Sequence, residues 1–191
     1  MKYFLITLVG ALLLLVDPAV AQDRFGVELR VGSDFATQDL GDTSLNTGFG
    51  SEVVFSYRFI PHLAAYGGYG YGRASTDGPS FAGADVVVEE TGYTFGLQHS
   101  RPLRASRYGY FVRGGGLYNH IELESGDRRA DSGHGLGWQI EAGPIATFGQ
   151  KWTVMPGLRY RSLSRDIEIG ETSTEVDRTY LSLGVGLLRT F

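Results

Sequence analysis

Apolar and polar side chains alternate along almost the whole chain from residue 25 onward. In "FGVELRVGSD", residues 25–34, one face of an extended chain holds Phe25, Val27, Leu29 and Val31, and the other holds glycine, glutamate and arginine. Successive side chains of a strand point to opposite faces, so a period of two predicts strands rather than helices. Eight segments follow this pattern, each about the ten residues that a tilted membrane-crossing strand requires. They cover residues 25–34, 47–59, 63–75, 89–100, 108–120, 136–148, 152–163 and 180–191.

The connections between these segments alternate in length. The second, fourth and sixth segments are followed by the short stretches "IPH", "RPLRAS" and "GQK". Longer, mostly acidic stretches follow the others: "ATQDLGDTSLN", "TDGPSFAGADVV", "ESGDRRADSGH" and "DIEIGETSTEVD". Short turns at one end and long loops at the other are typical of outer-membrane barrels, with both chain ends on the short-turn side.

The first 21 residues have the pattern of a secretory signal peptide. Lys2 precedes an apolar run, and the small residues Ala19 and Ala21 mark a cleavage site. We therefore predict a signal peptide over residues 1–21 and one domain over 22–191. A retained N-terminal anchor is the alternative, although the apolar run is shorter than the roughly 20 residues of a spanning helix.

Composition excludes several classes of protein. The chain has no cysteine, hence no disulfide framework and no thiolate metal site. Lys151 is the single lysine after residue 21, and the net charge is −4, so a basic nucleic-acid surface is absent.

The alternation fits two barrels of opposite orientation. A soluble lipocalin-like barrel turns its apolar face inward, whereas a membrane barrel turns it toward lipid. Glycine, 28 in all, recurs on the polar face, where it costs roughly 0.5–1 kcal/mol relative to alanine in a strand. A narrow eight-stranded lumen has room for few large side chains, which explains glycine on a face that points inward. The glycines therefore favour the membrane orientation.

Aromatic residues gather near both ends of the predicted segments. Amphipathic rings favour the headgroup level of a bilayer, so we predict two aromatic girdles. The short-turn girdle is Phe25, Tyr57, Phe59, Tyr110 and Trp152, and the long-loop girdle is Phe49, Tyr71, Tyr93, Tyr118, Trp138 and Tyr160.

Charged residues on the polar face nearly balance. Arginine is chosen over lysine, and its planar guanidinium pairs with carboxylates in a bidentate manner. We predict an ion-pair network in the lumen, because unpaired charges there would be costly. Its predicted members are Glu28, Arg30, Glu52, Arg58, Glu90, Arg113, Glu141, Arg159 and Arg161.

The whole chain from residue 22 to 191 resembles the small eight-stranded outer-membrane barrels of the OmpA/OmpX type. The resemblance implies an all-β, antiparallel, up-and-down transmembrane barrel in the outer membrane of a Gram-negative-type bacterium, with both mature termini in the periplasm. In that family a C-terminal strand that ends on an aromatic residue is a signal for the barrel-assembly machinery. "YLSLGVGLLRTF" resembles that signal and departs from it at Arg189; its outward-facing members are Leu181, Leu183, Val185, Leu187 and Phe191.

Signals for chemistry are sparse. "ADSGHG" places Ser132 and Asp131 beside His134, and His120 precedes Glu122, yet short local matches of this kind are common in polar loops. Scattered histidines without cysteine predict no metal site and no cofactor.

We therefore expect a non-enzymatic barrel with a plugged polar lumen and four surface loops. Its expected partners are outer-membrane lipid, lipopolysaccharide, the assembly machinery and an extracellular ligand of the loops, with a structural or adhesive role. A narrow pore for small solutes, or a lipid-A-modifying enzyme, remains the alternative.

Overall fold

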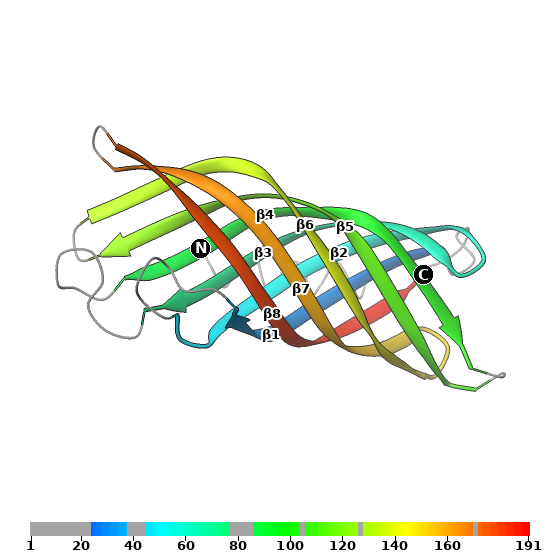
Figure 1. The fold of residues 1–191 in the computed structure, drawn as a ribbon. Coiled ribbons are helices and arrows are strands. Elements are labelled where there is room, and N and C mark those ends of the chain that lie inside the picture. Colours follow the sequence, from blue (N-terminus) through cyan, green and yellow to red (C-terminus); the bar gives the residue numbers. More distant parts are fainter. Residues whose placement is uncertain (1–23, 38–44, 77–85, 104–105, 126–127, 170–171) are drawn as a thin grey trace, which may run out of the picture.

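The protein folds into a single closed antiparallel barrel, with each strand hydrogen-bonded to the next in chain order (Figure 1). The computed structural model describes residues 24–37, 45–76, 86–103, 106–125, 128–169 and 172–191, without the side chains of 125–129 and 166–177. The predicted signal peptide and the middle of the first two long connections lie outside these ranges. The strands are β1 (Phe25–Ala36), β2 (Gly48–Ile60), β3 (Leu63–Ser75), β4 (Val87–Pro102), β5 (Tyr108–Ser125), β6 (Arg128–Phe148), β7 (Trp152–Ile169) and β8 (Thr172–Thr190).

The barrel closes where β8 pairs with β1. Their register runs from Gly26 opposite Thr190 to Ala36 opposite Tyr180. Beyond the last strand residue, the amide of Phe191 donates to the carbonyl of Phe25 at 2.9 Å. Closure removes the free sheet edges to which another chain could add. Among the described residues, no helix is long and apolar enough to cross a membrane.

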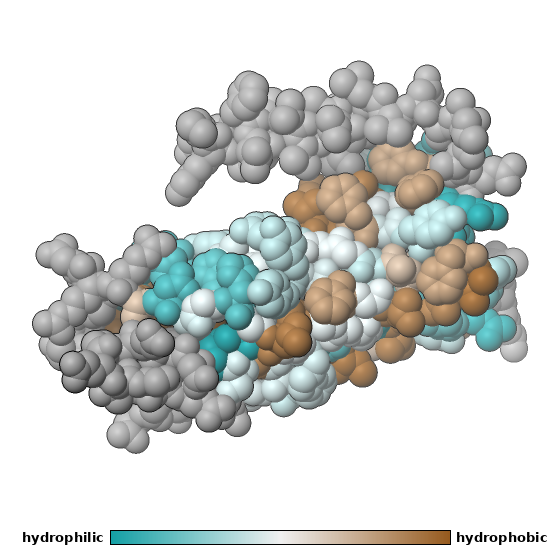
Figure 2. Space-filling model, turned by 90° about the horizontal axis from the view of Figure 1, so that it is seen from above, coloured by the Kyte–Doolittle hydropathy of each residue, from teal (hydrophilic) through white to brown (hydrophobic). Residues whose placement is uncertain are grey.

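The apolar face of the alternation points outward. Phe55 is 61% exposed, Leu183 60% and Leu97 52%, although all three are large apolar side chains. In Figure 2, apolar residues form patches among residues of intermediate hydropathy over the middle and the short-turn half of the visible surface, and hydrophilic residues gather toward the long-loop end, at the left. This is the orientation of a membrane barrel, so the eight-stranded transmembrane fold predicted from the alternation is confirmed and the soluble alternative is wrong.

Two connections predicted as long loops are mostly strand. β5 continues to Ser125 and β6 begins at Arg128, while β7 continues to Ile169 and β8 begins at Thr172. The strand ladder is made by the backbone, so polar side chains do not prevent pairing beyond the membrane, and β-branched residues such as Ile167 favour it. Two hairpins consequently project past the other strands (left end of Figure 1).

Inward-facing side chains form two layers of different chemistry. The middle of the lumen holds charged residues, described below. Toward the long-loop end lies an apolar layer of Val86, Val88, Leu117, Ile121, Leu123, Leu163 and Tyr180. Phe111 and Leu117, which interrupt the outward apolar phase of β5 in the sequence, are both fully buried.

Candidate functional site

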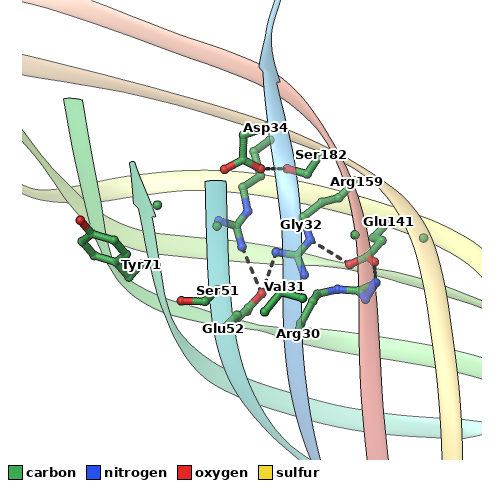
Figure 3. Close-up of a pocket in the computed structure, with 15 residues that line it drawn as sticks. Arg30, Val31, Gly32, Asp34, Ser51, Glu52, Tyr71, Glu141, Arg159 and Ser182 are labelled. Atoms are coloured by element: carbon green, nitrogen blue, oxygen red, sulfur yellow. Dashed lines mark hydrogen bonds and ion pairs between the residues drawn. The ribbon is translucent and has the colours of Figure 1, made fainter. Parts of the chain in front are cut away.

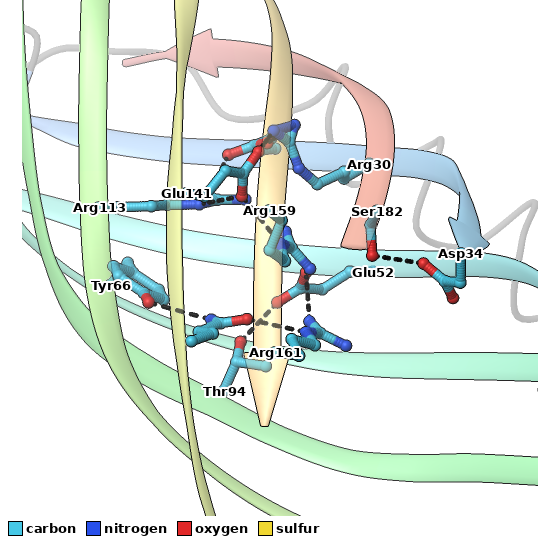
Figure 4. Close-up of polar contacts among 12 residues, drawn as sticks. Arg30, Asp34, Glu52, Tyr66, Thr94, Arg113, Glu141, Arg159, Arg161 and Ser182 are labelled. Atoms are coloured by element: carbon cyan, nitrogen blue, oxygen red, sulfur yellow. Dashed lines mark hydrogen bonds and ion pairs between the residues drawn. The ribbon is translucent and has the colours of Figure 1, made fainter. Parts of the chain in front are cut away.

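Glu141 on β6 is the centre of the charged layer. Its Oε2 accepts from Arg113 Nε and Arg159 Nε, both at 2.8 Å, and its Oε1 pairs with Arg30 (Figure 4). Arg113 on β5 and Arg159 on β7 are the direct cross-strand neighbours of Glu141. Strand register therefore creates an Arg–Glu–Arg row, and closure of the barrel brings Arg30 of β1 to it from across the lumen.

Glu52 and Glu90 extend the network toward the long-loop end. Arg159 Nη1 lies 2.6 Å from Glu52 Oε2, and Arg161 Nη2 lies 3.3 Å from the same oxygen. Arg161 Nη1 is 3.7 Å from Glu90 Oε1, and Arg178 Nε is 3.6 Å from Glu90 Oε2. Glu52 is thus shared between two guanidinium groups of β7, and Glu90 between one of β7 and one of β8.

Glu28 completes the layer on the short-turn side. Its Oε2 lies 2.9 Å from Arg113 Nη1, and its Oε1 lies 3.3 Å from Arg30 Nη1. Arg30 also donates to the carbonyl of Met155 at 3.0 Å. The guanidinium groups of Arg30 and Arg113 both lie 5.8 Å from the ring centroid of Phe111, within the range of a cation–π contact.

Neutral side chains also donate hydrogen bonds to the buried carboxylates, in addition to the arginines. A buried carboxylate offers about four acceptor sites, so several donors are needed for each. Thr94 donates to Glu52 at 2.5 Å, Asn119 to Glu90 at 2.6 Å, and Tyr180 to Glu90 at 2.9 Å. Arg161 Nε donates to Gln139 at 2.9 Å, and Gln139 in turn donates to Tyr66 at 3.0 Å. The layer is therefore a connected network rather than a set of isolated pairs.

Two glycines provide the space that the network occupies. A Cβ at Gly157 would lie 2.9 Å from both Arg30 Nη2 and Phe111 Cζ, and a Cβ at Gly186 would lie 2.8 Å from Glu28 Cδ. Real Cβ atoms essentially never come this close to another heavy atom. A side chain at either lumen position would therefore force the ends of the surrounding buried side chains to shift.

One small cavity lies within the charged layer, and a larger vestibule lies at the short-turn end. The small cavity, of about 30 Å³, is large enough for about two water molecules and is bordered by residues that include Arg30, Glu141 and Ser182 (Figure 3). The vestibule, of about 270 Å³, is lined by residues that include Arg58 and Met155. Met155, which borders the vestibule, and Gly157, which borders the small cavity, are successive inward residues of β7.

The structure brings together most of the residues predicted for the network. Eight of the nine make ion pairs there: Glu28, Arg30, Glu52, Glu90, Arg113, Glu141, Arg159 and Arg161. Arg58 instead lies exposed beside the vestibule, because it is near the turn where β2 ends.

Sequence reasoning missed Arg178 and Asp34. Asp34, which accepts from Ser182 at 2.5 Å, has the same parity as Glu28 and Arg30 on β1. Arg178 has the same parity as Ser182 on β8, but it lies two residues before the last predicted segment, which begins at residue 180. Asp34 is the final residue of the first predicted segment, and extending the last segment by two residues would have included Arg178.

Comparison of the chain with protein-family models identifies its family. The model described as "Outer membrane protein beta-barrel domain" matches residues 6–187. The chain belongs to this family. It is a small outer-membrane barrel of the OmpA/OmpX type.

Solved structures share the fold of this outer-membrane barrel at low sequence identity. The crystal structure of Neisserial surface protein A matches with a TM-score of 0.63 and 17% identity, over 87% of this chain and 97% of that one. OprG from Pseudomonas aeruginosa matches with a TM-score of 0.59 and 11% identity, over 87% and 95%. AlkL, solved in DMPC bilayers, matches with a TM-score of 0.55 and 16% identity, over 92% and 93%. No curated protein matches the chain.

The predicted girdle residues of this outer-membrane barrel lie on its outer face. Those that are more than a third exposed are Phe25, Phe49, Tyr57, Phe59, Tyr71, Tyr93, Tyr110, Tyr118, Trp138 and Trp152, and Tyr160 is half-buried. Several pack ring to ring across neighbouring strands: Tyr69 and Tyr93 have centroids 5.2 Å apart, and Trp138 and Tyr160 5.3 Å.

The C-terminal strand presents a mixed outer face. Leu183, Val185 and Leu187 are exposed and Leu181 is half-buried, but Phe191 is only 7% exposed where the alternation predicts an outward-facing ring. The guanidinium of Arg189 lies 4.9 Å from the ring centroid of Phe191 and 5.5 Å from that of Trp152. Arg189, the departure from the family pattern, is thus accommodated by two aromatic rings at the short-turn end.

The "ADSGHG" stretch is structural in its hydrogen bonding. Ser132 Oγ accepts from the amide of Ile121 at 2.8 Å and donates to the carbonyl of Gly133 at 2.9 Å. Asp131 accepts from the amide of Gly133 at 2.7 Å. Strand pairing also brings Asp131 beside Glu122 and places His134 opposite His120. This juxtaposition was not evident from sequence, because it depends on the register of β5 and β6.

Proposed function

We propose that this outer-membrane barrel is a non-enzymatic envelope protein whose lumen is closed by the charged layer and which acts through the hairpins and loops at its long-loop end. The observation that carries the proposal is the sharing of Glu141 by three arginines from three strands, at an exposed fraction of 2%. An ion crossing the lumen would have to separate these pairs, and leaving one buried charge unpaired costs about 3–5 kcal/mol.

Planar-bilayer recording tests the closed lumen. We expect the wild-type protein to show no large, stable openings. The double variant Glu52→Ala plus Glu141→Ala removes two carboxylates at the centre of the layer and should admit water and ions. A double variant at two outer-face positions, Glu89→Ala plus Leu136→Ala, is the control and should behave as wild type. Large, stable openings of the wild-type protein would overturn the proposal.

The vestibule supports a second candidate function, a narrow route for small solutes. The vestibule is an open space of about 270 Å³ at the short-turn end of the lumen. Under this alternative the charged layer would act as a gate, and wild-type conductance would rise with voltage or ionic strength instead of staying at the baseline.

We also propose that the long-loop end faces the exterior and that both mature termini are periplasmic. The chain has no cysteine, so single introduced cysteines report topology directly. Thr47→Cys, at the exposed residue immediately before β2, should react with a membrane-impermeant maleimide on intact cells. Gln150→Cys, in the exposed turn between β6 and β7, should react only after the outer membrane is permeabilised. The reverse pattern would contradict this orientation.

The proposal that the barrel is not an enzyme is supported by Ser132, whose hydroxyl is hydrogen-bonded to the backbone at Ile121 and Gly133. Mass analysis of lipid A from cells with and without the protein tests it, and an altered acyl pattern would contradict the proposal. Outer-membrane lipid and lipopolysaccharide are the expected surroundings of the apolar face. The assembly machinery is the expected partner of the C-terminal strand.

A further inference from the structure

Three side chains that can ligate a metal converge on the outer face of the β5–β6 hairpin. They are His120 and Glu122 of β5 and Asp131 of β6, and one ligand atom from each lies within 4.8 Å of the other two. The cluster begins two residues beyond Tyr118, a member of the long-loop girdle. It therefore stands just outside the apolar belt of the barrel.

An irregularity in strand pairing builds the cluster. His120 is opposite His134 and Glu122 is opposite Asp131, so one residue of β5 faces two of β6 between these pairs. Gly133, inside the irregularity, has a φ of 66°, in the left-handed region that glycine adopts without strain. The extra residue draws Asp131 toward the β5 side chains, which regular pairing would not do.

Hydrogen bonds at the irregularity hold Asp131 in place. The Gly133 amide donates to Asp131 Oδ1 at 2.7 Å, which fixes the carboxylate and leaves Oδ2 on its other side. Ser132 links the two strands through the Ile121 amide at 2.8 Å. A ligand oriented by the backbone in this way loses little conformational freedom on binding a metal.

The imidazole of His120 is also positioned. Its ring centroid lies 4.6 Å from that of His134, and His134 lies 5.2 Å from Tyr118. Among the described residues, His120 Nδ1 is buried and has no hydrogen-bond partner. Buried polar atoms are almost always bonded, so this nitrogen is available as a ligand.

Charge favours a cation at this position. Glu122 is only 5% exposed and lies beside exposed Asp131, and the next carboxylate, Glu89 of β4, is opposite Glu122. Glu89 accepts from Tyr71 at 2.7 Å and faces Arg73 at 3.7 Å, so it belongs to a separate contact.

We propose that His120, Glu122 and Asp131 bind one divalent ion of the zinc class on the outside of the barrel. One imidazole nitrogen and two carboxylate oxygens suit zinc, whereas calcium takes six to eight oxygen ligands. Three protein ligands leave a fourth position for water or for an anionic oxygen of the surroundings. The ion would join β5 to β6 where the irregularity interrupts their ladder, and so clamp the projecting hairpin.

Cobalt absorption of the untagged, folded mature barrel in detergent tests the site. Co²⁺ in a four-coordinate site absorbs far more strongly in the visible range than the hydrated ion. We expect strong bands at one equivalent, bleached by Zn²⁺ and not by millimolar Ca²⁺. Asp131→Asn and His120→Gln should each weaken zinc binding at least tenfold. His99→Gln, an exposed histidine at the opposite end of the barrel, should bind as wild type.

Folding is checked in each variant by the mobility difference between heated and unheated samples. Asp131 is exposed, so Asp131→Asn remains informative if His120→Gln folds poorly. A wild-type spectrum equal to that of hydrated Co²⁺ would overturn the proposal. So would zinc affinity that is equal in wild type and Asp131→Asn, or bleaching by Ca²⁺ as effective as by Zn²⁺.

Discussion

The inward-facing side chains form two layers of opposite chemistry. In the middle, arginines and glutamates make directional pairs around Glu141. Toward the long-loop end, Leu117, Ile121 and Leu163 are packed with at most 3% of each exposed. An apolar layer depends on volume and tolerates substitution by side chains of similar size. A charged layer depends on the presence of every partner, since one lost carboxylate leaves buried cations uncompensated.

The largest effect is expected at the centre of the charged layer. Glu141→Gln keeps the shape of the side chain but removes the charge shared by Arg30, Arg113 and Arg159. We expect a loss of about 3–5 kcal/mol in the free energy of unfolding, measured by urea titration in lipid bilayers. Glu89→Gln, on the outer face, is the control and should cost less than about 1 kcal/mol. Equal costs would remove the distinction between the lumen network and a surface pair.

In the apolar layer, size should matter more than identity. Leu117→Ala is expected to lower the free energy of unfolding by about 2–4 kcal/mol, because it leaves a cavity at a fully buried site. Leu117→Met conserves volume and should cost less than about 1.5 kcal/mol. Leu136→Ala, at an outward position that is 71% exposed, is the matched truncation outside the layer. If Leu117→Met lowered the free energy of unfolding as much as Leu117→Ala, the apolar layer would depend on the identity of its side chains as strongly as the charged layer does.

The space beside individual glycines offers a further test of how tightly the charged layer is packed. Gly157→Ala brings a methyl group into Arg30 and Phe111, so we expect it to cost about 1–3 kcal/mol in the same titration. At Gly67 the nearest atom to an added Cβ is the Thr94 carbonyl oxygen, at 3.8 Å. Gly67→Ala should therefore be neutral or stabilise by up to about 1 kcal/mol. A neutral Gly157→Ala would show that the network has room to rearrange.

The smallest effect is expected at a solvent-exposed ion pair. Arg73 Nε lies 3.7 Å from Glu89 Oε1, and the Arg73 side chain is 56% exposed. Arg73→Gln should change the free energy of unfolding by about 0–1 kcal/mol, and 1 M salt should cancel the difference. A cost that survives high salt would mean that burial is not what separates this pair from the lumen pairs.

The barrel could be predicted from the sequence because alternation is imposed by lipid on one side and a narrow lumen on the other. Phe55, Leu97 and Leu183 follow that pattern, and so do Glu52 and Glu141. The ends of the strands could not be predicted in the same way. Beyond the membrane there is no lipid that would require one face of a strand to be apolar. The continuation of β7 to Ile169 therefore lacks a clear alternation of apolar and polar residues by which it could be predicted.

The ion-pair network of the lumen and the cluster of His120, Glu122 and Asp131 also differ in how far the sequence could predict them. Arg113, Glu141 and Arg159 form a row through register, and their parity was visible before the register was known. Parity also indicated Arg58, but a position near a turn does not reach the centre of the lumen. The grouping of His120 with Asp131 depends on one extra residue in β6, which no alternation predicts.

The central claim is that direct ion pairs hold the lumen closed, and a double-mutant cycle on Glu52 and Arg159 tests it most directly. Their atoms are 2.6 Å apart and both side chains are less than a tenth exposed. Unfolding of wild type, Glu52→Gln, Arg159→Met and the double variant in bilayers gives their coupling free energy. We predict a coupling of about 2 kcal/mol or more, at the upper end of values for contacting residues. Additive effects, within about 0.5 kcal/mol, would contradict the account.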